Sequence, residues 1–149
     1  SSAASDVYKR QMRFFFYGTL LDPDVTALVL RRRLPPSAFQ PAQLSGYVRR
    51  RAVGKTYPMV ARRRGGSVIG AMVGGLTARD AARLAAYEGS NYRLASLAVR
   101  VKGRLERVSV FEPQGPGLQP SDDAWDLANW QVRHKRAFVA YIRPLLARL

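Results

Sequence analysis

The order of the predicted elements indicates an α+β fold, built on a small mixed, mostly antiparallel β-barrel with flanking helices. Three observations carry this prediction. Strand-like segments follow one another with only a few inserted helices. Two alternating segments, 92–101 and 104–111, are separated by Lys102-Gly103, which is typical of a hairpin. Glycines within the segment 67–76 permit the curvature that a closed sheet needs.

The first part of the chain predicts a strand and a helix. Residues 13–17 include three consecutive phenylalanines, which leave no polar face and therefore indicate a buried strand. Asp22 and Pro23 open a helix, because aspartate accepts backbone N–H bonds as an N-cap and proline suits the first helical position. The helix runs through Val29, and Pro35-Pro36 places a loop after it.

The middle of the chain is rich in strand signals. Loose alternation over residues 43–53 indicates a strand. Residues 57–60 predict a short extended piece, since proline biases its predecessor away from the helical region. We interpret Gly65-Gly66 as a hairpin turn and residues 67–76 as the strand that follows it.

Two further helices are predicted. Thr77 begins the first through a capping box in which Asp80 takes the usual place of glutamate, and Gly89 ends it as a left-handed cap. After the hairpin, the prolines and glycines of residues 112–120 predict a loop. Ser121 is expected to cap a final helix from about Asp122 to Arg143, whose aromatic side chains are available to pack.

Composition excludes several classes of protein. The chain has 149 residues, of which 47% are hydrophobic, and fits one domain with a substantial core. No run approaches the roughly 18 apolar residues that span a bilayer, and no secretory signal is expected because the N-terminal residues are polar. The lack of cysteine excludes thiol chemistry, and a single histidine, His134, makes a zinc site or a Ser–His–Asp triad unexpected. We therefore expect a cytoplasmic protein.

The net charge of +15 comes mainly from arginine, including the triplets Arg31–Arg33, Arg49–Arg51 and Arg62–Arg64. One interpretation is a surface that attracts nucleic acid, acidic lipid or an anionic small molecule. The alternative is that the triplets lie on solvated faces and keep the protein soluble. We favour the second, because the triplets lack the interleaved aromatic residues that are typical of base-reading surfaces.

Two short segments carry candidate chemistry. Tyr17-Gly18-Thr19-Leu20 directly follows the phenylalanines, and a strand that ends in Gly-Thr can present backbone N–H groups toward a ligand. Glu88 ends an apolar helix before a glycine, where a carboxylate can act as a proton shuttle in a cleft. Together they supply an oxyanion holder and a base, which suffice for a simple acyl transfer. Taken alone, each is better explained as an ordinary tight turn or a solvated glutamate.

An ordered set of short matches resembles the gamma-glutamylcyclotransferase-like superfamily, including its AIG2-like branch. The similarity runs from about Met12 to Val101 and is carried by Phe15-Phe16-Tyr17-Gly18-Thr19-Leu20, Tyr57-Pro58-Met59-Val60, Val68-Ile69-Gly70, and Glu88-Gly89 with Tyr92. The resemblance implies the gamma-glutamylcyclotransferase-like fold for residues 12–149 as a single domain. Because residues 1–11 precede this pattern and lack an initiator methionine, we expect them to be a non-native or artefactual extension.

The resemblance also implies an activity. In this family a γ-glutamyl compound closes on itself to give 5-oxoproline, and an amine leaves. Glu88 would be the catalytic base and then the acid, while the bend Tyr17, Gly18, Thr19 and Leu20 would bind the substrate. Tyr92 would bind substrate through its phenol or simply pack, and Tyr57 is a weaker candidate. No metal or organic cofactor is required, because no electron or hydride moves.

Several alternatives stay open at this point. The substrate could be glutathione, another γ-glutamyl dipeptide or a γ-glutamyl amine. A different function is a catalytically inactive barrel that binds nucleic acid or another anionic partner through its basic surface; nucleic acid is possible but not favoured. A membrane partner is not expected, and the oligomeric state is open.

Overall fold

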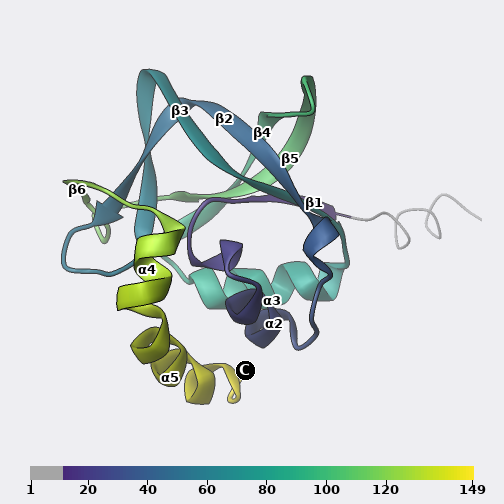
Figure 1. Ribbon diagram of the computed structural model, residues 1–149, viewed down its shortest axis with the longest axis vertical. Helices are drawn as coiled ribbons and strands as arrows, with labels where there is room; N and C mark the ends of the chain where they lie inside the picture. The colour runs from purple at the N-terminus through teal and green to yellow at the C-terminus, as the bar shows by residue number, and fades with distance from the viewer. Residues whose placement is uncertain (1–11) are drawn as a thin grey trace, which may run out of the picture.

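The computed structural model describes residues 12–149, so the expectation for residues 1–11 lies outside the described residues. Five strands close into a barrel in the order β3-β1-β5-β4-β2, with β2 pairing back onto β3, and β6 extends the sheet beyond β2 (Figure 1). The β1–β5 pairing is parallel and the others are antiparallel, which confirms the predicted mixed, mostly antiparallel barrel. The strands are β1 (Met12–Phe16), β2 (Phe39–Ala52), β3 (Pro58–Leu76), β4 (Tyr92–Val101), β5 (Arg104–Pro113) and β6 (Pro120–Ala124).

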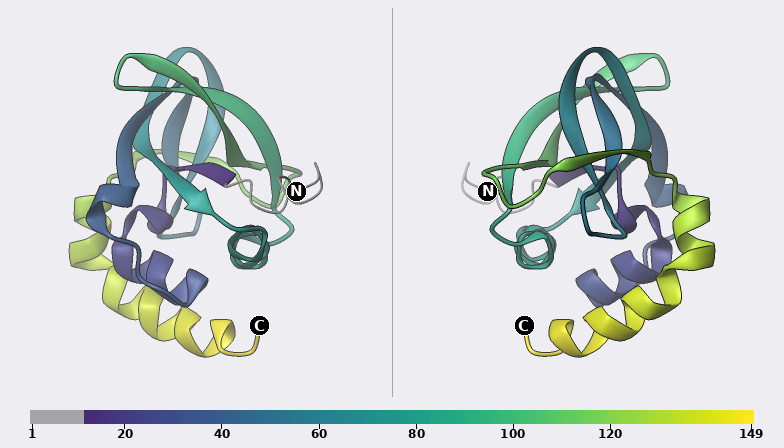
Figure 2. Two further views of the ribbon diagram at one scale, coloured as in Figure 1. Left: turned by 90° about the vertical axis from the view of Figure 1, so that its right-hand side faces the viewer. Right: turned by 90° about the vertical axis from the view of Figure 1, so that its left-hand side faces the viewer.

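The helices gather on one side of the barrel, as Figure 2 shows. They are α2 (Pro23–Leu30), α3 (Ala78–Glu88), α4 (Leu127–Arg133) and α5 (Lys135–Leu146), with short 3-10 turns η1 (Thr19–Leu21) and η2 (Pro36–Ala38). None of the helices in residues 12–149 is long and apolar enough to cross a membrane.

The phenylalanines of β1 serve two hydrophobic cores. Phe15 belongs to the cluster inside the barrel, whereas Phe14 and Phe16 belong to the cluster between the barrel and the helices. All three are at most 2% exposed. Because successive residues of a strand point to opposite faces, a strand buried on both faces requires apolar side chains at every position. Burial on both faces holds β1 in position, and it therefore also positions the start of the bend that follows.

The N-terminal caps that the sequence predicts for α2 and α3 are present in the structure. The Asp22 side chain accepts hydrogen bonds from the N–H groups of Asp24 (2.8 Å) and Val25 (3.1 Å), with Pro23 at the start of α2. Thr77 and Asp80 form the reciprocal capping box of α3. Gly89 has a positive φ of 80°, but its ψ of −170° is extended, so it ends α3 without the predicted left-handed helical geometry.

The predicted hairpin turn at Gly65-Gly66 is wrong. These residues lie within β3, a single 19-residue strand that pairs with β2 along its length. The register jumps from Ser45–Ser67 to Tyr47–Arg62, so β3 carries extra residues in a bulge. A Cβ at Gly66 would lie 2.5 Å from the carbonyl oxygen of Tyr47, which explains the glycine by close backbone approach.

The predicted final helix is also wrong over its first residues, 122–126. Ser121 lies in β6, which pairs with β2 through Arg50–Ala124 and Ala52–Pro120. The helix begins later, where the Asp126 side chain accepts a bond from the N–H of Asn129, and it breaks at His134 into α4 and α5. A serine followed by aspartates is a local cap signal, but the free edge of β2 offers these residues ladder hydrogen bonds instead.

The arginine triplets are partly structural. Arg49 donates hydrogen bonds to the carbonyl oxygens of Tyr17 (3.0 Å), Ile69 (2.9 Å) and Trp125 (3.2 Å), and its guanidinium lies 5.5 Å from the centre of the Trp125 ring. Other members pair with carboxylates: Arg32 with Asp80, Arg33 with Asp24, Arg51 with Asp123, and Arg62 with Glu112. Arg49 therefore joins the bend after β1, strand β3 and the segment before α4.

Replacing Arg49 by lysine should destabilise the fold. A lysine ammonium has no planar fork and cannot reproduce the three carbonyl contacts and the ring contact, so we expect a loss of about 1–3 kcal/mol in the free energy of unfolding. Urea denaturation measures it. Arg50→Lys is the matched control, since Arg50 is the neighbouring residue of the same strand and makes no side-chain hydrogen bond within residues 12–149. Equal losses in both variants would contradict this role.

Candidate active site

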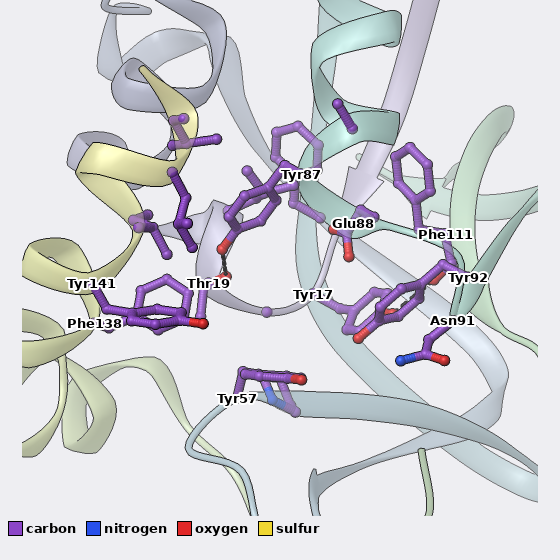
Figure 3. Close-up of a pocket in the computed structure, with 18 of the residues that line it drawn as sticks. Tyr17, Thr19, Tyr57, Tyr87, Glu88, Asn91, Tyr92, Phe111, Phe138 and Tyr141 are labelled. Carbon is purple, nitrogen blue, oxygen red and sulfur yellow. Dashed lines mark hydrogen bonds between the residues drawn. The ribbon is translucent and has the colours of Figure 1, made fainter. Parts of the chain in front are cut away.

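A cavity of about 440 Å³ lies where the end of β1, the end of α3 and the face of α5 meet (Figure 3). This volume is in the range typical of small-molecule sites. All six residues that the sequence proposed for the site line it: Tyr17, Gly18, Thr19, Leu20, Glu88 and Tyr92. Tyr57, the weaker candidate, lines it as well. The bend and the glutamate thus face a common space, although their segments lie far apart in the sequence.

The residues of the bend line this cavity, and three of their backbone amides have no acceptor among residues 12–149. Gly18 follows β1, and the turn η1 forms through hydrogen bonds from Leu21 N–H to Gly18 O (2.9 Å) and from Asp22 N–H to Thr19 O (3.0 Å). The N–H groups of Gly18, Thr19 and Leu20 donate to no other residue that the structure describes. Three neighbouring amides without acceptors can hold a carboxylate or a developing oxyanion.

Crowding favours glycine at position 18. A Cβ at this position would approach Pro58 Cγ to 3.1 Å and Cδ to 3.3 Å, although the φ of Gly18 is negative at −126°. The glycine therefore lets the bend pass closely beside the start of β3, where Tyr57 and Pro58 form one side of the cavity.

Glu88 is the last residue of α3 and the one carboxyl side chain among the described residues that line the cavity. Its carboxyl makes no hydrogen bond or ion pair with another residue in 12–149. Although the residue keeps some contact with the cavity space, burial among aromatic side chains raises its pKa from 4.5 to about 8. A carboxyl group with a near-neutral pKa is suited to take up and return a proton near pH 7.

Four tyrosines surround this carboxyl group: Tyr17, Tyr57, Tyr87 and Tyr92 (Figure 3). Burial raises the pKa of each phenol, so all four stay protonated. Tyr17 donates its hydroxyl to the carbonyl oxygen of Phe111 (2.7 Å), and Tyr87 shares a 2.6 Å hydrogen bond with the Thr19 hydroxyl. Within the described residues the hydroxyls of Tyr57 and Tyr92 have no partner, and both remain available to a ligand.

Sequence reasoning missed part of the wall. Asn91 points into the cavity, and Gly117 packs so closely against it that a Cβ there would lie 2.3 Å from Asn91 Oδ1. Phe138 and Tyr141 of α5, expected only to pack, also line the cavity. No local signal separates a helix face that covers a core from one that borders a cavity.

The buried carboxyl predicts a pH-dependent stability difference. Its raised pKa favours the neutral form in the folded state, so wild-type stability falls as the pH rises from 4.5 towards about 8, while Glu88→Gln has no such loss. The pKa shift sets an upper limit of about 5 kcal/mol on the difference in free energy of unfolding between Glu88→Gln and the wild type at high pH. Because Glu88 keeps some contact with solvent, we expect a difference of about 1–3 kcal/mol. Urea denaturation at pH 5 and pH 9 measures it: the variant should gain stability at pH 9 and little at pH 5. A constant difference between the two pH values would contradict this environment.

Comparison with known proteins gives a consistent result. The family model "Gamma-glutamyl cyclotransferase, AIG2-like" matches residues 14–131. The Arabidopsis thaliana protein AIG2 C is 28% identical over 137 residues, covering 89% of this chain and 79% of its own. A solution structure of an Arabidopsis thaliana protein matches with a TM-score of 0.65 and 26% identity, over 92% of this chain and 82% of that one. A structure titled gamma-glutamyl cyclotransferase has a TM-score of 0.59 and 19% identity over 76% of this chain and 73% of that one, a likeness that shows the fold alone.

Proposed function

The chain belongs to the AIG2-like gamma-glutamyl cyclotransferase family, and from this membership we propose that it cyclises the γ-glutamyl group of a small amine or peptide conjugate to 5-oxoproline and releases the amine. One observation carries the proposal: Glu88, with its pKa raised to about 8, shares a cavity with the bend, three of whose backbone amides have no acceptor within residues 12–149. Among residues 12–149 no group of three histidine, cysteine, aspartate or glutamate side chains is placed to hold a metal ion.

The proposed reaction is a proton transfer followed by ring closure. The carboxylate of Glu88 takes a proton from the substrate's α-ammonium group, and the freed amine attacks the γ-carbonyl carbon. A carbon–nitrogen bond forms, and the carbonyl oxygen becomes an oxyanion. Glu88 then returns its proton to the leaving nitrogen and takes the second proton from the ring nitrogen, which became positively charged on attack. The original amide bond breaks, the oxyanion collapses to the lactam carbonyl, and Glu88 passes the second proton to the released amine. Atoms and charge balance without another reactant.

The bend and the tyrosines hold the substrate in its bent form. The amides of Gly18, Thr19 and Leu20 bind the α-carboxylate or the oxyanion, and the free hydroxyl of Tyr92 donates a further hydrogen bond. Nucleophile and electrophile belong to one molecule, so most of the barrier reduction comes from fixing the reactive conformer.

A panel of γ-glutamyl compounds tests the proposal. The full chain is incubated with glutathione, other γ-glutamyl dipeptides and γ-glutamyl amines, and 5-oxoproline and the free amine are quantified. We expect equal amounts of both products from at least one compound. Release from none of them would overturn the proposal and leave a barrel that acts by binding.

The pKa of Glu88 also predicts the pH profile. The free enzyme must carry the ionised carboxylate, so kcat/KM should rise about tenfold per pH unit below about 8 and then level off. The rise of kcat with pH should occur at a lower pH than the rise of kcat/KM, because the ammonium group of the bound substrate stabilises the carboxylate. Initial rates between pH 5 and pH 9 measure both limbs. A kcat/KM that is flat across this range would exclude Glu88 as the base.

A further inference from the structure

The cavity has two chemically different halves. Figure 3 shows Tyr92 and Asn91 on one side, near Glu88, and Phe138 and Tyr141 of α5 on the other. Besides the aromatic pair, α5 adds three aliphatic side chains to the wall: Ile142, Leu145 and Leu146. The α5 half thus offers hydrocarbon and aromatic surface, with the Tyr141 hydroxyl as its polar group.

This half is open to an occupant. Tyr141 is 68% exposed and Leu145 is 43% exposed, although both border an apolar space that continues directly from the bend and Glu88. A γ-glutamyl group held between the bend and Glu88 would leave the surface of α5 for the rest of the substrate. Apolar side chains that border a ligand cavity gain free energy when an apolar group covers them.

The charges that line the cavity also bear on which leaving group it can hold. The chain carries a net charge of +15, yet no lysine or arginine is among the described residues that line the cavity. The amides of the bend can hold one carboxylate, that of the glutamyl group itself. A second carboxylate on the leaving group would lose its hydration in the α5 half without a cation to replace it, which is costly.

We propose that the α5 half is the leaving-group site, and that the preferred substrate is the γ-glutamyl amide of an amine with an aromatic or branched aliphatic substituent and no carboxylate. This inference rests on the proposed function and narrows it. It assigns specificity to Phe138, Tyr141 and Leu145, which touch the departing amine and take no part in proton transfer.

Three matched compounds test the substrate class. γ-Glutamylphenethylamine carries the apolar ring, γ-glutamylphenylalanine adds only a carboxylate to it, and γ-glutamylethylamine lacks the ring. The kcat/KM for the first should exceed that for each of the others by about 10- to 100-fold, the usual effect of one apolar group in a fitted pocket. Equal values, or a preference for the phenylalanine conjugate, would overturn the inference and leave the proposed function standing. Release of 5-oxoproline from no γ-glutamyl compound would overturn both.

A charge placed in the wall tests the assignment to α5. Leu145→Arg adds a cation to the α5 half at a position exposed enough to accept it, so it should raise kcat/KM for the phenylalanine conjugate relative to the phenethylamine conjugate by at least about tenfold. The control is Val132→Arg, which adds the same charge at a residue of α4 that is 86% exposed and outside the cavity. The ratio should not change in the control. An unchanged ratio in folded Leu145→Arg, checked by circular dichroism, would place the leaving group elsewhere.

Discussion

Replacing Glu88 by glutamine should lower kcat for 5-oxoproline release by about 100- to 10,000-fold, the range expected for losing a general base and acid. Glutamine keeps the size of the side chain and its place at the end of α3, but its amide cannot accept the proton of the substrate's ammonium group. Substrate binding should persist, because the amides of the bend are unchanged. The loss should therefore appear in kcat far more than in KM.

Glu106→Gln is the matched control for this variant. Glu106 makes an ion pair with Arg13 on the surface at 2.7 Å and is not part of the cavity, so its replacement should leave kcat within about twofold, as expected for a surface pair. Denaturation curves at pH 9 separate lost chemistry from lost structure, since the Glu88 variant should be at least as stable as wild type there. A Glu88→Gln protein that keeps more than a tenth of the wild-type kcat would show that another group moves the proton.

The parts of the fold that could be predicted from sequence are those fixed by local chemistry. The helix caps are examples: Asp22 before Pro23, and Thr77 with Asp80, accept hydrogen bonds from N–H groups only one turn away. Their roles can therefore be predicted from a few neighbouring residues. Prediction from neighbouring residues failed at Ser121, where a helix cap was expected. Residues 120–124 pair instead with the edge of β2, which is remote in sequence. Such prediction failed at Gly65-Gly66 too, because a glycine required by close approach to Tyr47 looks the same in sequence as a glycine required by a turn.

The candidate site shows the same division. Short motifs and a family resemblance predict that the bend Tyr17–Leu20 and Glu88 share one site. The periodicity and spacing of the residues alone do not predict this. The contact that joins their segments, the hydrogen bond between Thr19 and Tyr87, spans 68 positions. The α5 wall was missed because its aromatic residues repeat at the spacing of a core-facing helix, and only the tertiary structure shows that part of this face borders a cavity.

Gly70 should be the least replaceable glycine of the barrel. A Cβ at this position would lie 2.2 Å from the carbonyl oxygen of Phe16 and 2.8 Å from Cζ of Phe15. Neither atom can withdraw easily, because the first is backbone and the second belongs to a ring buried inside the barrel. We expect Gly70→Ala to cost at least about 3 kcal/mol in the free energy of unfolding, at the upper end for overpacking, and to lower Tm by about 6–12 °C.

The strain at Gly70 should also reach the site. Phe16 pairs with Ala71 at the end of β1, immediately before the bend, which lines the cavity together with Glu88 and whose amides we propose to hold the substrate. If β1 moves away from β3 to admit the new methyl group, those amides move with it, so kcat/KM should fall even well below the lowered Tm. Gly74→Ala is the control on the same strand, because its Cβ would meet nothing nearer than Arg13 Cγ at 3.6 Å. Thermal denaturation and rate measurements on both proteins decide the matter: similar stability and activity in the two variants would mean that the barrel relaxes around the methyl group and that its closure does not hold the bend in place.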